Sequence, residues 1–162
     1  AKVLVRVGST AGIADRVSDG DYILPTGAVP LEGASPIYLD NDPFAHVPDF
    51  EVLRTLHDVA SETGKRVHTG VVLVHDAFYA ETDAFLERWH SRNVVSVEME
   101  SSILFLIGTL RKVRTAAFHL AGGNLMTKSR ANWTPAELEA ARATQHRVVL
   151  EAFKRLDDMG IV

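Results

Sequence analysis

The sequence has 162 residues, a formal net charge of −4 and no cysteine. This length suits one domain with a real hydrophobic core, and the interspersed charges without a dense basic cluster exclude a nucleic-acid-binding surface. The lack of cysteine excludes a disulfide scaffold, a thiol nucleophile and a cysteine metal site, and no apolar run approaches membrane-spanning length. We therefore expect a cytoplasmic protein that binds neither nucleic acid nor membranes.

The first half of the chain predicts two strands, a long loop and a helix. Val3–Val7 is an apolar run typical of a buried strand, and Asp21–Leu24 is a second, shorter one. Residues 26–48 carry Gly, Pro, Asp and Asn throughout, which predicts an irregular loop. Asp49 can cap a helix whose apolar residues follow the 3.6-residue period, and Gly64 ends it.

The second half of the chain alternates strands with helices. The first of these strands lacks polar alternation, which indicates a sheet covered on both faces. The last helix has the clearest start, a capping box with proline at the first helical position. The predicted elements are a strand over Val67–Val74, a helix over 82–91, a strand over Val94–Val97, a helix over Glu100–Leu110, a strand over Thr115–Ala121, and a helix from Thr134-Pro135-Ala136-Glu137 to Gly160.

This order of elements is typical of an α/β fold with a mixed or mostly parallel sheet. We expect residues 1–162 to form a single domain. The chain opens directly in the apolar run Lys2–Val7 without an initiator methionine, so we also expect that N-terminal sequence is missing.

The first candidate site is Arg6 followed by Gly8, Ser9 and Thr10. An arginine beside small residues with free backbone N–H groups can hold an anion. A tight turn with a surface arginine is the alternative, and spacing alone favours it because no P-loop lysine or GxGxxG motif is present.

The second candidate is Phe78, in the segment His75–Tyr79 that follows an apolar strand. Ligands of open α/β sheets bind outside the carboxyl ends of strands, where an aromatic ring can stack on a planar heterocycle. The alternative, that Phe78 and Tyr79 pack under the following helix, is modestly favoured by the residues alone.

The third candidate is Val97-Glu98-Met99-Glu100-Ser101. A carboxylate accepts hydrogen bonds from a vicinal diol, and a thioether can lie against the apolar side of a sugar ring, which points to ribose. Alternatively, one glutamate caps the next helix and the methionine fills the core.

The fourth candidate is Asn124, after Gly122 and Gly123, whose amide could read a base edge. A glycine turn with a left-handed asparagine is an equal alternative. The seven histidines show no HxxxH or HxH spacing, so we predict no metal site.

Taken together, these segments resemble the nucleoside phosphorylase family, which includes uridine phosphorylase, bacterial hexameric purine nucleoside phosphorylase and related nucleosidases. The resembling pieces fall in family order and span nearly the whole chain. They are Arg6–Gly12, Asp19–Asp21, Gly27–Val29, Pro48–Glu51, Asp76–Tyr79, Val97–Ser101 and the C-terminal helix.

The resemblance implies a three-layer α/β/α sandwich with a mixed, partly barrel-like central sheet, assembled as a homo-oligomer, either a dimer or a hexamer. It implies reversible phosphorolysis of a ribonucleoside to free base and ribose 1-phosphate. Inorganic phosphate is then a co-substrate, and no cofactor is needed.

The resemblance also assigns roles to single residues. Arg6 and Glu100 are the expected catalytic residues. Phosphate binding falls to Arg6, Gly8 and Ser9, ribose binding to Glu98, Met99 and Glu100, and base binding to Phe78, Val97, Glu98 and Asn124.

Two departures from the family pattern bear on the base. Purine-specific members carry a Ser-Asp pair where this chain has Gly122-Gly123, and uridine phosphorylases carry a Gln-x-Arg pair near the positions of Thr82 and Ala84. The segment Leu31–Ser35 looks more like the uridine branch, so a uridine-like substrate is slightly favoured.

The resemblance leaves two other activities open, a nucleosidase that uses water and a catalytically weak nucleoside-binding member. If the polypeptide begins at Ala1, we expect impaired phosphate binding and an exposed sheet edge.

Overall fold

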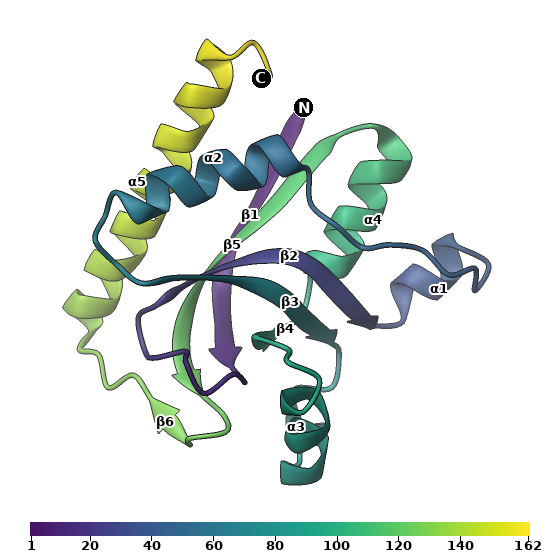
Figure 1. Ribbon diagram of the computed structural model, residues 1–162, viewed down its shortest axis with the longest axis vertical. Coiled ribbons are helices and arrows are strands. Elements are labelled where there is room, and N and C mark those ends of the chain that lie inside the picture. The colour runs from purple at the N-terminus through teal and green to yellow at the C-terminus, as the bar shows by residue number, and fades with distance from the viewer.

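A computed structural model describes residues 1–162, and its centre is a ring of five strands, arranged as Figure 1 shows. The hydrogen-bonded order is β1-β4-β3-β2-β5-β6, and β1 also pairs with β5, which closes the ring. Parallel and antiparallel pairs both occur, so the predicted mixed, partly barrel-like sheet is confirmed. The strands are β1 (Val3–Gly12), β2 (Tyr22–Leu31), β3 (Val67–His75), β4 (Ser96–Glu98), β5 (Arg114–Asn124) and β6 (Ser129–Arg130).

Helices surround this ring, with α5 at one side in Figure 1 and α4 with α1 at the other. The largest core cluster joins α2 and α5 to the sheet through side chains such as Leu56, Val148 and Phe118. A second cluster lies under α3. The helical segments are α1 (Ala34–Tyr38), α2 (Phe50–Ser61), the single 3-10 turn η1 (Phe78–Ala80), α3 (Asp83–His90), α4 (Ser101–Arg111) and α5 (Pro135–Asp158).

The helix starts follow the sequence signals closely. Asp49 accepts a hydrogen bond from the backbone N–H of Val52 at 3.1 Å and caps α2 as predicted. Thr134 and Glu137 form the predicted capping box of α5. No helix in the fold has both the length and the apolar character that crossing a membrane would require.

The predicted loop over 26–48 is wrong at residues 26–31, which continue β2, and at Ala34–Tyr38, which form α1. β2 continues to Leu31 and pairs with β3 along its length, with a register shift between Pro25 and Gly27. It pairs with β5 only at Tyr22 and Ile23. Pro25 and Pro30 lie beyond these residues, so they remove no backbone hydrogen bond to β5. Helix α1 follows because buried Glu32 accepts backbone hydrogen bonds at its start.

The first strand is longer than predicted and has an open edge. β1 pairs with β5 from Val3 to Thr10, but with β4 only at Ala11 and Gly12. The second edge of β1 before Ala11 therefore carries no strand partner.

Candidate functional site

Arg6, in the middle of β1, lies between two carboxylates that come from the end of β4. Its Nε is 3.2 Å from Oε2 of Glu98 and donates to Oε2 of Glu100 at 2.8 Å, and its Nη2 also donates to Glu100. β1 and β4 run antiparallel, with Ala11 opposite Val97. The chain that follows β4 therefore continues alongside β1 in the direction of Arg6. This topology joins two of the predicted segments into one site.

The two glutamates have different surroundings. The Glu98 side chain is 1% exposed and accepts hydrogen bonds from the backbone N–H groups of Glu100 (3.0 Å) and Ser101 (2.9 Å). Glu98 therefore binds the first backbone N–H groups of α4, whose N-cap residue is Glu100, while Met99 does not fill the core as the alternative for this motif expected. The Glu100 side chain is 55% exposed, and Arg6 is the residue that it contacts.

Burial governs the protonation of this site. Burial raises the pKa of Glu98, and the hydrogen bonds from Ser101 and the charge of Arg6 only partly offset that shift. Burial likewise lowers the pKa of Arg6, against the effect of Glu98. Because a guanidinium stays charged in proteins, the site holds a fixed cation beside one buried and one accessible carboxyl group.

His119 on β5 is a component of the site that the sequence analysis did not single out. Its imidazole is fully buried, with Nε2 3.8 Å from Oε2 of Glu98 and 3.4 Å from Oγ of Ser101. Burial and the nearby charge of Arg6 lower the pKa of His119 to about 3, so the ring is neutral at pH 7. A polar residue inside the otherwise apolar run Ala116–Ala121 was the available signal.

Gly8 and Ser9 follow Arg6 inside β1 and pair with β5, so the loop of small residues expected after Arg6 is extended strand instead. A Cβ on Gly8 would overlap the guanidinium of Arg6, so only glycine leaves room for this arginine to lie along the strand. Nε2 of Gln145, on α5, donates to the carbonyl oxygens of Gly8 (2.9 Å) and Phe118 (3.0 Å) and holds β1, β5 and α5 together. The Ser9 side chain is exposed.

Met99 and Phe78 are both exposed enough to meet a ligand. Met99 follows Glu98 directly and is 39% exposed. Phe78 is 59% exposed and makes an edge-to-face contact with Tyr79, with ring centroids 5.2 Å apart. Because β3 and β4 are parallel, with Val74 opposite Glu98, the segment that carries Phe78 leaves the sheet at the same edge as Met99.

Two residues predicted to contact the base have packing roles instead. The Val97 side chain is buried in the cluster under α3, on the face of β4 opposite Glu98. The Asn124 amide donates to the carbonyls of Ala14 (2.9 Å) and Val17 (3.0 Å), and its oxygen accepts from two backbone N–H groups. With every hydrogen-bonding position used, Asn124 fixes two loops rather than reading a base.

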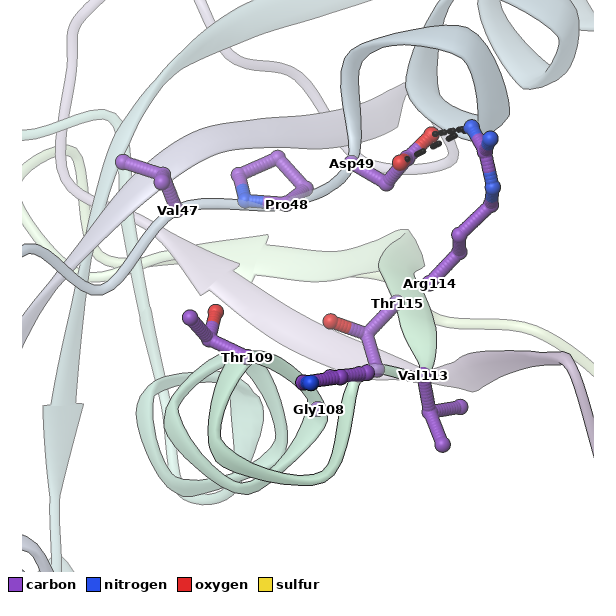
Figure 2. Close-up of a pocket in the computed structure, with 9 residues that line it drawn as sticks. Val47, Pro48, Asp49, Gly108, Thr109, Val113, Arg114 and Thr115 are labelled. Carbon is purple, nitrogen blue, oxygen red and sulfur yellow. Dashed lines mark hydrogen bonds and ion pairs between the residues drawn. The ribbon is translucent and has the colours of Figure 1, made fainter.

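A separate cavity of about 310 Å³ lies at the other end of α4 (Figure 2). Figure 2 shows Asp49 and Arg114 joined across its rim, with distances of 3.2 and 3.4 Å from Nη1 to the carboxylate oxygens. Asp49 also caps α2, so its carboxylate has a structural role. This cavity contains none of the predicted site residues.

Comparisons with known proteins identify the family of the chain. Residues 1–157 match the model of the phosphorylase superfamily. The chain is 29% identical to a guanosine phosphorylase of Halorubrum lacusprofundi, over 77% of this chain and 52% of the relative. It is 34% identical to a uridine phosphorylase of Treponema pallidum, over 76% of this chain and 52% of the relative.

A solved structure has the same fold. The P. knowlesi homologue of P. falciparum PNP superposes with a TM-score of 0.78 and 32% sequence identity, covering 95% of this chain and 64% of that one. The chain spans about half the length of the curated relatives it matches. With a family match over almost every residue and a shared fold, the chain belongs to the phosphorylase superfamily.

Proposed function

We propose that the protein is a nucleoside phosphorylase, which converts a ribonucleoside and inorganic phosphate reversibly to free base and ribose 1-phosphate. The observation that carries the proposal is the contact of Arg6 with Glu98 and Glu100. It places a cation suited to phosphate beside a carboxylate suited to a ribose diol. Family membership and relatives named guanosine and uridine phosphorylase support it.

The chemistry follows from the charges at the site. Cleavage of the glycosidic bond passes through an oxocarbenium-like state, which nearby negative charge stabilises. Phosphate held by Arg6, the Gly8 amide and Ser9 supplies that charge together with the attacking oxygen. Glu100 accepts hydrogen bonds from the ribose hydroxyls, Met99 packs on the sugar, and Glu98 keeps α4 and Arg6 in place while bordering the ribose.

For the base, we propose a contact with Phe78 and a uridine-like substrate slightly ahead of purine nucleosides. Gly122 and Gly123 offer no acid to protonate a departing purine, which supports this order. A homo-oligomer is part of the proposal, as in the family described above. No metal or organic cofactor enters the reaction, because phosphate and the side chains named here supply all of its charges.

Release of free base from uridine, inosine and adenosine, with and without phosphate, tests the proposal. We expect phosphate-dependent release, fastest with uridine, and formation of ribose 1-phosphate. Release at the same rate without phosphate would instead identify a nucleosidase. Nucleoside binding without release of base, both with and without phosphate, would identify a binding protein. This outcome is worth testing because two carboxylates already contact Arg6.

A further inference from the structure

The cavity at the C-terminal end of α4 shares no residue with the Arg6 site (Figure 2). Its volume of about 310 Å³ is enough for a small ligand. Backbone hydrogen bonds join the segments that form its walls. The N–H of Asp49 donates to the carbonyl of Thr115 at 2.7 Å, and the N–H of Val113 donates to the carbonyl of Gly108 at 2.8 Å. The cavity is therefore held in shape by the fold itself.

Thr115 brings a hydroxyl group without a partner into this cavity. The residue is only 3% exposed and lines the cavity, yet its hydroxyl group takes part in no hydrogen bond within the chain. Figure 2 shows the hydroxyl oxygen directed toward the open centre of the cavity. Gly108 keeps this space open, because a Cβ there would lie 2.8 Å from the hydroxyl oxygen. Since buried polar groups are nearly always hydrogen-bonded, this hydroxyl group indicates a ligand.

Two basic side chains next to Thr115 also have hydrogen-bond donors that no protein group uses. Lys112 is the C-cap residue of α4, where a lysine can bond the last carbonyls of the helix, but its ammonium group makes no hydrogen bond or ion pair. Arg114 uses only Nη1, which is 3.2 and 3.4 Å from the carboxylate oxygens of Asp49. Its Nε and Nη2 stay available to a ligand.

The charges of the lining indicate the class of that ligand. Lys112 and Arg114 together with Asp49 leave one net positive charge, which matches a monoanion better than a phosphate dianion. A planar carboxylate fits the donor fork of an arginine, and apolar side chains beside it can cover a short carbon chain. The apolar residues of the lining are Val47, Pro48 and Val113.

We propose that this cavity binds a small organic carboxylate, whose oxygens accept hydrogen bonds from Lys112, Arg114 and the Thr115 hydroxyl. The site is separate from the proposed reaction, because it uses none of the residues assigned to phosphate, ribose or base. Helix α4 has 11 residues, or about 16 Å, and lies between the cavity and Glu100 at its N-cap.

Titration with sodium butyrate at constant ionic strength, followed by the backbone amide chemical shifts of Asp49 and of residues 112–115, tests the proposal. We expect saturable shifts, and a much weaker response to butyramide, which has a similar shape but no charge. Thr115→Val removes only the hydroxyl group and should raise the fitted dissociation constant about tenfold. Its urea midpoint should be unchanged or higher, because the hydroxyl group has no partner in the free protein.

Lys112→Gly removes a cation without straining the fold. Lys112 has a left-handed φ of 56°, which glycine adopts without steric cost. We therefore expect about tenfold weaker butyrate binding with no loss in urea midpoint. Lys128→Gly is the matched control, since Lys128 has a φ of 57° and lies outside the cavity. It should leave butyrate binding unchanged.

Several outcomes would overturn the proposal. Butyrate may give no saturable shift, butyramide may bind equally well, or Thr115→Val may bind butyrate as tightly as the wild type. Equal weakening by Lys112→Gly and Lys128→Gly would also overturn it. Tighter binding of inorganic phosphate at the same amides would assign the cavity to phosphate instead of a carboxylate. Arg6→Gln should leave all these shifts intact, and their loss would place the carboxylate at Arg6. These binding measurements stay informative if the chain releases no base.

Discussion

The buried imidazole of His119 should make the folded protein less stable as the pH falls, and His119→Leu should remove that effect. Burial lowers the pKa of His119 to about 3, whereas an unfolded histidine has a pKa of about 6.5. Between these two values the unfolded chain binds a proton that the folded chain does not. Stability due to neutral His119 is therefore complete above about pH 6.5 and is lost as the pH falls toward about 3.

The size of the effect follows from the two pKa values. Well inside the window, the free energy of unfolding should fall by about 1.4 kcal/mol for each pH unit, which gives about 2 kcal/mol between pH 7 and pH 5. Glu98, with a raised pKa, acts in the opposite direction, but it is present in both proteins. The difference between wild type and His119→Leu therefore isolates the histidine. At pH 7 the substitution should change little, because it also removes a buried Nδ1 that has no partner.

Urea denaturation of both proteins at pH 7, 6 and 5, followed by circular dichroism, measures this difference. We expect the variant to gain about 2 kcal/mol relative to wild type between pH 7 and pH 5. His57→Leu, which replaces a half-exposed histidine on α2, should show no such gain. Equal pH dependence of wild type and His119→Leu would refute a neutral, buried imidazole.

Three further predictions concern the site and its supports. Glu100→Ala should lower kcat by orders of magnitude in the base-release assay, where each tenfold loss corresponds to about 1.4 kcal/mol. Near-normal turnover would mean that Glu100 only forms an ion pair with Arg6. Gly8→Ala should displace the Arg6 guanidinium and raise the KM for phosphate roughly tenfold, about 1.4 kcal/mol, with the urea midpoint as a check that the fold persists. Asn124→Ala leaves two carbonyls and two backbone N–H groups without their partner. It should lower the free energy of unfolding by about 2–4 kcal/mol in urea titrations. An unchanged urea midpoint would contradict the structural role of Asn124.

Local signals in the sequence predicted local structure well. The capping box at Thr134 and the cap at Asp49 need only residues within one helical turn, and both helices begin where these signals stand. The extension of β2 to Leu31 depends on pairing with β3, more than 40 residues later, and no local pattern around Pro25 and Gly27 carries that information.

The candidate site likewise depends on contacts between residues that are far apart in the sequence. Arg6 and Glu100 are 94 positions apart, and resemblance to a family, rather than spacing, brought them together before the structure did. Asn124 was misread because its hydrogen-bond partners, Ala14 and Val17, are more than 100 positions away. His119 was missed because burial, which lowers its pKa, depends on the whole fold.

The unequal burial of the two glutamates has a consequence for the order in which substrates bind in the proposed reaction. Glu98 is held by the backbone N–H groups of Glu100 and Ser101 as well as by Arg6, so we expect incoming phosphate to displace the exposed Glu100 instead. Phosphate then replaces one negative charge at Arg6 by another, and the released carboxylate becomes available to the ribose hydroxyls. We therefore expect the two substrates of the proposed reaction to be thermodynamically linked, with phosphate raising the affinity for nucleoside and nucleoside raising the affinity for phosphate by the same factor.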